Sequence, residues 1–131
     1  MSRVTRWLTL AVLVVLAACS SQTPEEQAMA TAQECYEQLM SGNSEAFLNG
    51  RAGMDSIPQS YREQLLVSYR QFAHMQRQAH GGVTSVEATR TVMDSTLHVM
   101  QVFLLINFAD STKEEIVVPM VEDNEGRWKM K

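Results

Sequence analysis

The sequence lacks any apolar run long enough to cross a bilayer, and it lacks any cluster of lysine or arginine. The apolar stretch near the N-terminus, residues 7–15, is much shorter than the roughly 20 residues that a transmembrane helix needs. The formal net charge of the 131 residues is −4 at pH 7. Because an acidic surface without basic patches repels phosphate backbones, the composition disfavours nucleic-acid binding.

The first 19 residues have the layout of a cleaved export signal. Arg3 and Arg6 supply positive charge, residues 7–15 are apolar, and Leu16-Ala17-Ala18-Cys19 ends the segment with small residues. These last four residues resemble a bacterial lipobox. The resemblance implies that the Cys19 thiol receives a diacylglyceryl group, that cleavage leaves Cys19 first, and that its amine is acylated too. The alternative is an ordinary secretory signal with an incidental cysteine.

The predicted cleavage and lipidation at Cys19 imply where the mature domain begins and in which membrane the protein is anchored. Residues 1–18 are predicted to be a signal peptide, 19–23 the lipidated cysteine with a short tether, and 24–131 one α+β domain. Loss of Arg3 and Arg6 lowers the net charge by two, to −6. Several acyl chains anchor a protein firmly, since each buried methylene contributes about 0.8 kcal/mol. Ser20 replaces the aspartate that retains enteric lipoproteins at the inner membrane, so resemblance to that pattern implies the outer membrane, on the periplasmic side or the cell surface.

Cysteine is scarce as well, with two residues in the chain. With Cys19 modified by lipid, Cys35 has no partner, which excludes a disulfide within the chain even in an oxidising compartment. Cys35 lies on the apolar stripe of the first predicted helix. We expect a buried, inert thiol there, and the alternative is a reactive or intermolecular cysteine.

Three helices are expected before any strand. Thr23 and Pro24 begin the first helix as N-cap and first helical residue, and Gly42 ends it. A short helix at 45–48 and a loop at 50–57 follow. A long third helix starts at residue 58, and we expect it to be the main cover of the sheet. Its apolar stripe consists of Tyr61, Leu65, Tyr69, Phe72, Met75 and Ala79.

Residues 96–122 predict an antiparallel hairpin, because two β-rich runs are separated by the polar turn Asp110-Ser111-Thr112. The first run is apolar on both faces, so it should lie centrally in the sheet. A strand beginning at residue 83 precedes it, and a short strand at 127–131 ends the chain. The predicted fold class is α+β, with three N-terminal helices packed on a curved four-stranded antiparallel meander.

Three stretches carry a resemblance to a known group of proteins. They are Thr23-Pro24-Glu25-Glu26, then Tyr36-Glu37-Gln38-Leu39-Met40-Ser41-Gly42-Asn43, and finally Asn124-Glu125-Gly126-Arg127-Trp128-Lys129-Met130. Together with the lipobox they resemble the small bacterial lipoproteins of uncharacterised function that have a nuclear transport factor two-like (cystatin-like, cone-shaped) fold. The resemblance implies a curved sheet wrapped on a helix, with a pocket between them. It implies no activity, because this fold serves enzymes, transport adaptors and binding modules.

Side chains that could line such a pocket give no diagnostic spacing. Enzymes similar in fold, such as ketosteroid isomerases and scytalone dehydratases, place an aspartate or histidine and a tyrosine inside the cone. Tyrosines on helical stripes are more often core residues, so we predict no catalytic residue. The candidate pocket residues are Tyr36, Tyr61, Tyr69, Phe72, His98, Met100, Phe103 and Trp128.

Histidine offers the remaining chemistry. His98 is expected to share a strand face with Met100, where its imidazole could bind a ligand or a proton, and the alternative is a half-exposed histidine near a strand end. A soft-metal site is disfavoured because His74 and His80 lie on different helix faces, and zinc lacks a ligand set. We predict no metal and no cofactor.

These expectations indicate a lipid-anchored cell-envelope binding or interaction module of unknown ligand, without catalysis. Because the sheet is apolar on both faces and one helical layer is available, the second face should pack on another copy or on an envelope protein. A small apolar ligand is a further candidate partner. The rival hypothesis is a small-molecule enzyme of the ketosteroid isomerase or dehydratase type, with its pocket between the long helix and the sheet.

Overall fold

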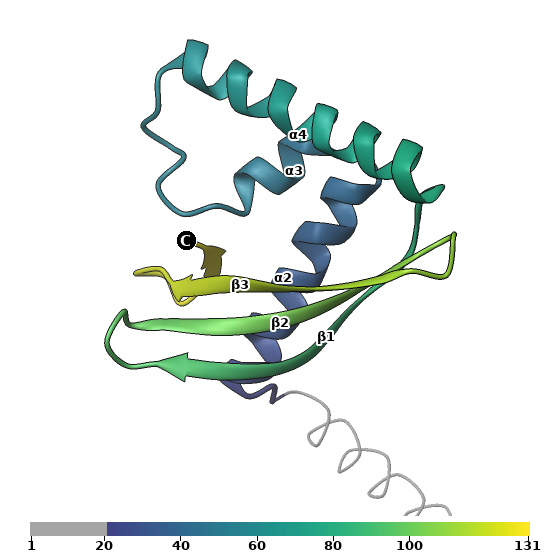
Figure 1. Cartoon of the computed structure of the whole chain (residues 1–131). Helices are drawn as coiled ribbons and strands as arrows, with labels where there is room; N and C mark the ends of the chain where they lie inside the picture. The colour runs from purple at the N-terminus through teal and green to yellow at the C-terminus, as the bar shows by residue number, and fades with distance from the viewer. Residues whose placement is uncertain (1–20) are drawn as a thin grey trace, which may run out of the picture.

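Three helices precede a four-stranded sheet in the computed structural model, which describes residues 21–131 (Figure 1). The predicted signal peptide and Cys19 lie outside the described residues. The order of elements confirms the predicted α+β fold class. The elements are α2 (Pro24–Met40), α3 (Ser44–Asn49), α4 (Gln59–His80), β1 (Val83–Asp94), β2 (Val99–Phe108), β3 (Lys113–Glu122) and β4 (Trp128–Met130).

Helix α2 begins where the sequence predicts it. Thr23 is the N-cap, its hydroxyl accepts a hydrogen bond from the Glu26 N–H at 3.2 Å, and Pro24 occupies the first turn. The buried stripe of the helix consists of Ala28, Ala32, Cys35, Leu39 and Met40. Small residues early in this stripe allow the helix to lie close against the strands.

The strands form one antiparallel sheet in the order β1-β2-β3-β4, so β2 is central as predicted. One face of β2, which we call the inner face, is buried against α2. It carries Met100, Val102, Leu104, Ile106 and Phe108, and the strands beside it add Val86, Val118 and Met120. Alternate residues of β2 lie on the opposite, outer face.

Helix α2, and not the long helix α4, is the main cover of the sheet, which corrects the expectation from the apolar stripe of α4. Only Leu66 and Ala73 of α4 are fully buried, and α4 packs mainly on α3 and α2. Figure 1 shows α4 on the far side of α3 from most of the sheet. The reason is that α2 already occupies the inner face, and Gly81 (φ 77°) and Gly82 (φ 109°) turn the chain sharply into β1 at the edge of the sheet.

The loop after α3 extends the sheet at the β4 side. The Ala52 N–H donates to the Met130 carbonyl at 2.7 Å, and the Met130 N–H donates to the Gly50 carbonyl at 2.8 Å. Arg51 and Met130 thereby form a parallel bridge. This pairing covers the backbone edge of β4, which would otherwise be open to strand addition.

Candidate functional site

The outer face of the sheet has no helical layer among residues 21–131, and its centre is apolar. On β2, Phe103 lies between Arg90 of β1 and Val117 of β3, and Leu105 is the next residue on the same face. Val92 of β1 lies one pair further along, beside Gln101. Val117 is 45% exposed. We call Val92, Phe103, Leu105, Val117 and Pro119 the outer sheet patch. A shallow depression of about 540 Å³ overlaps one end of this patch, and its lining consists of Val92, Met93, Asp94, Ser95, Gln101, Phe103 and Val117.

Charged side chains border the outer sheet patch on both sides. On β1, the Arg90 guanidinium lies 3.5 Å from the centre of the Phe103 ring, and Glu87 pairs with Leu105. On β3, Glu115 pairs with Leu105 and Lys113 pairs with Asn107. Each flank therefore carries one cation and one anion, and the apolar strip lies between them.

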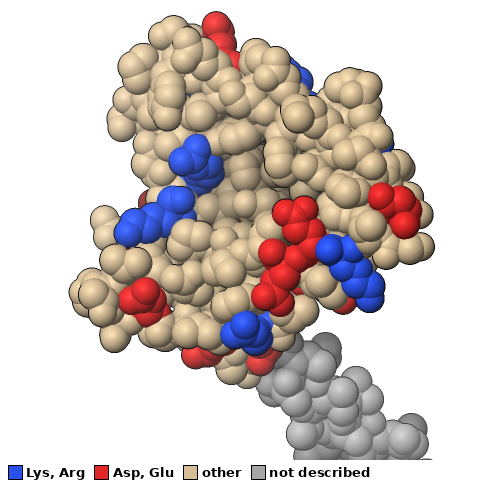
Figure 2. All heavy atoms as spheres, viewed as in Figure 1, with Lys and Arg blue, Asp and Glu red and all other residues tan. Residues whose placement is uncertain are grey.

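The structure brings together two of the candidate pocket residues, Tyr36 and Tyr69. The Phe47 ring lies between them, in edge-on contacts with ring centres 5.2 Å from Tyr36 and 4.8 Å from Tyr69. Arg51 Nη1 donates a hydrogen bond to the Tyr69 hydroxyl at 2.6 Å. Burial raises the pKa of Tyr36, and the neighbouring Cys35 and Tyr69 raise it further. We call Tyr36, Phe47, Arg51 and Tyr69 the aromatic cluster. Figure 2 shows a hollow between the part of the molecule that contains α4 and the part that contains the strands.

The other candidate residues lie elsewhere. Tyr61 and Phe72 are exposed on α4, Met100 is buried beneath α2, and Phe103 is on the outer face. The Trp128 Nε1 is buried without a hydrogen-bond partner among the described residues. These side chains do not form one pocket with the aromatic cluster.

His98 does not share a strand face with Met100, because β2 begins at Val99. Asp94 Oδ1 accepts hydrogen bonds from the N–H groups of Thr96 and Leu97, both at 3.0 Å, and this turn carries His98 with φ 53° in an exposed position. The Asp94 side chain thus stabilises a turn that ends β1, and β2 begins only at Val99. His98 is a turn residue of the β1–β2 hairpin.

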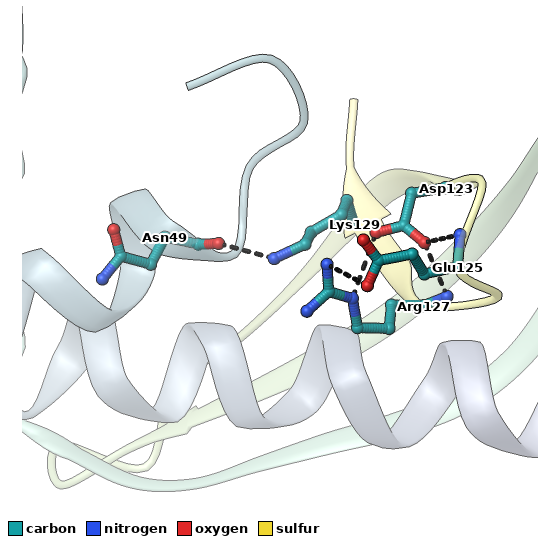
Figure 3. A network of polar contacts seen from close by, with 5 residues as sticks. All are labelled: Asn49, Asp123, Glu125, Arg127 and Lys129. Carbon is teal, nitrogen blue, oxygen red and sulfur yellow. Dashed lines mark hydrogen bonds and ion pairs between the residues drawn. The ribbon is translucent and has the colours of Figure 1, made fainter. Parts of the chain in front are cut away.

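A polar cleft that the sequence did not indicate lies between the loop after α3 and the β3–β4 hairpin (Figure 3). Its volume is about 390 Å³. Lys129 Nζ donates to the Asn49 carbonyl at 2.9 Å, which ties the hairpin to the loop. Asp123 accepts from the Arg127 backbone N–H at 2.9 Å, and this bond is the main reason that the pKa of Asp123 is lowered. Arg127 is paired with Asp123 and Glu125, so the contacts mainly hold the hairpin in shape.

Within the described part of the chain, no group of three or more His, Cys, Asp or Glu side chains is arranged to hold a metal ion. No helix formed by residues 21–131 is long and apolar enough to cross a membrane.

A comparison with protein-family profiles gives no match for this chain, and a comparison with curated proteins gives none either. Among solved structures, the chain is similar to a 2.00 Å crystal structure from Campylobacter jejuni, whose provisional name is NTF2-like transpeptidase. The TM-score is 0.60 at 12% identity, and the match covers 76% of this chain and 92% of that one. This chain therefore has an NTF2-like, that is nuclear transport factor two-like, α+β fold.

Proposed function

We propose that this chain is a lipid-anchored, non-catalytic binding module of the cell envelope, and that it associates with a second copy through the outer sheet patch. The observation that carries the proposal is the apolar strip of Phe103, Leu105 and Val117 on a sheet face that no described helix covers. Exposed contiguous apolar surface of this kind is typical of interaction sites. The expected lipid on Cys19 would hold the module at the outer membrane.

The charges beside the patch favour a second copy of the chain as the partner. A two-fold axis perpendicular to β2, passing between Phe103 and Leu105, would place β1 of one copy over β1 of the other in the opposite direction. Because Arg90 lies beside Phe103 and Glu87 lies beside Leu105, Arg90 of each copy would then face Glu87 of the other, and Phe103 would face Leu105. The charges of the β1 flank are therefore complementary to those of the same flank on a second copy, as an isologous interface requires.

The chemistry of the described residues favours binding over catalysis. The Campylobacter protein is named as a transpeptidase, and acyl transfer of that kind uses an activated nucleophile such as a thiolate. Cys35 is buried, and its burial, together with Glu34, raises the pKa of the thiol. Both effects disfavour a reactive thiolate.

A small-molecule enzyme is the second candidate function, and the aromatic cluster is the observation that favours it. Tyr36 and Tyr69 lie beside Phe47, and the Arg51 guanidinium contacts the Tyr69 hydroxyl. Such an enzyme would also need an acid or base near these hydroxyl groups. Among the described residues, Arg51 is the only side chain bonded to either hydroxyl.

Light scattering of the chain from Ser20 onward, at tens of micromolar, tests the proposal. We expect a dimer, and we expect Val117→Lys to give a folded monomer. Val67→Lys on α4 is the matched control, because Val67 and Val117 are both 45% exposed, and it should leave the dimer intact. A monomeric parent chain, or equal effects of the two substitutions, would contradict self-association through this face. Capture of a different envelope protein by the patch would instead assign the face to that partner.

A further inference from the structure

The β1–β2 hairpin and the start of α2 lie at the same end of the molecule. Met40, at the C-terminal end of α2, packs with Ile106 and Phe108 near the end of β2. The first turns of α2 therefore lie near the beginning of β2, where Val99 follows the hairpin turn. The β3–β4 hairpin is there too, since Gln22 and Gln27 line a depression with Gly126 and Trp128. In Figure 1 the purple start of α2 lies close to the arrowhead of β1.

The tip of the β1–β2 hairpin exposes two large apolar side chains. Met93 is 59% exposed and Leu97 is 56% exposed. Turns at hairpin tips normally consist of small and polar residues, so these side chains are unusual there. The two hydrogen bonds that Asp94 Oδ1 accepts fix the turn, and Leu97 is thus held outward by a defined backbone rather than by a loose loop.

The tether between the predicted lipid and this end of the molecule is short. Cys19 precedes Pro24 by five residues. An extended chain spans at most about 3.3–3.6 Å per residue, so the acylated cysteine can be no more than roughly 18 Å from the start of α2. A membrane that holds the lipid must therefore lie close to the end that carries the hairpin tip.

We propose that Leu97 and Met93 rest in the interfacial region of the membrane that holds the lipidated Cys19. This inference depends on the lipid anchor of the proposed function. The surroundings indicate the lipid chemistry, because Glu25, Glu26 and Asp94 are acidic and would be repelled by an anionic surface. The hairpin tip therefore suits a bilayer of zwitterionic phospholipids, and it would restrict rotation of the domain about its tether.

A fluorescent label at the tip tests this contact in the full, lipidated chain. Ser95→Cys places an NBD label in the turn while keeping Leu97, and Gln64→Cys on the exposed surface of α4 is the matched control. The unsubstituted chain measures background labelling of Cys35, which is 8% exposed. Each protein is purified from membranes and reconstituted into phosphatidylcholine and phosphatidylethanolamine vesicles, with or without spin-labelled lipid.

We expect NBD at position 95 to emit at shorter wavelength and to be quenched by spin-labelled lipid at least twofold more than NBD at position 64. Adding Met93→Thr and Leu97→Asn should remove at least half of that quenching while the protein still floats with vesicles. Equal quenching at both positions in floating protein would overturn the membrane contact but leave the anchor intact. A spectral shift without quenching would assign the tip to protein contact and overturn it too. Protein that does not float would overturn the anchor and, with it, this inference.

Discussion

Gly50 and Cys35 approach so closely that no side chain fits between them. A Cβ atom placed on Gly50 would lie 2.5 Å from Cys35 Sγ and 3.3 Å from the Phe47 carbonyl oxygen. Gly50 has φ −80°, which any residue can adopt, so the constraint is steric and not conformational. This contact joins the stripe of α2 to the loop that pairs with β4.

Gly50→Ala should therefore destabilise the domain through overpacking, by about 1–3 kcal/mol. Urea unfolding of the chain from Ser20 onward measures the loss. Gly50→Ala combined with Cys35→Ala should recover part of it, because the sulfur atom is removed while the Phe47 carbonyl remains. Additive effects of the two substitutions in a double-mutant cycle would show that Cys35 is not the obstacle.

The pH dependence of stability should contain a contribution from Asp110 at the β2–β3 turn. Its carboxylate accepts a hydrogen bond from the Thr112 hydroxyl and contacts His80 Nδ1 at 2.9 Å, and these bonds lower the pKa of Asp110 from 3.8 to about 2. A folded-state pKa below the unfolded value stabilises the folded protein above about pH 3.8, and this stabilisation is lost as the pH falls towards 2.

Asp110→Asn should lower the free energy of unfolding at pH 7, and its difference from the parent chain should shrink between pH 4 and pH 2. Urea unfolding at several pH values measures this. Asp55→Asn is the control, since Asp55 is exposed and makes no hydrogen bond or ion pair with any described residue. A constant difference across that range would rule out the Asp110 carboxylate as its source.

Local features of the sequence predicted the order of elements correctly. Thr23 and Pro24 begin α2, and the glycines after α4 end it, because caps and turns depend on neighbouring residues. The central position of β2 was also predicted from neighbouring residues, because both faces of this strand are apolar. The packing partners of the helices were harder to predict, since an apolar stripe shows which side of a helix is buried but not which element covers it. The apolar stripe of α4 therefore led to the wrong prediction that α4, and not α2, is the main cover of the sheet.

The candidate site shows the same limit. Tyr36 and Tyr69 meet only because α3 inserts Phe47 between them, and no local pattern in residues 44–49 indicates that position. The pairing of residues 50–52 with β4 joins segments far apart in the chain, so the polar cleft that contains Asn49 and Lys129 had no signal in the sequence. His98 was misplaced because the Asp94 turn extends further than the polar residues alone suggested.

Tyr69→Phe should lower stability by about 1–2 kcal/mol, because it removes a part-buried hydrogen bond from a charged donor, Arg51 Nη1. Tyr61→Phe is the matched control, since Tyr61 is 46% exposed on the same helix and its hydroxyl has no described partner. Thermal unfolding of both variants measures the difference. Equal midpoints for the two variants would show that the Arg51 contact contributes nothing to the fold.

Cys19→Ser should release the protein from membranes in its host bacterium, because the thiol that carries the diacylglyceryl group is lost, and no helix of residues 21–131 could span the membrane in its place. Flotation of cell lysates on a density gradient measures the membrane-bound fraction, and mass spectrometry of the mature chain should find residues 1–18 absent and Cys19 acylated. Cys35→Ala is the control, since it removes the other cysteine and should leave flotation unchanged. If the Cys19→Ser chain floats as the parent chain does, the lipid anchor is wrong, and the placement of the hairpin tip at the membrane is wrong with it.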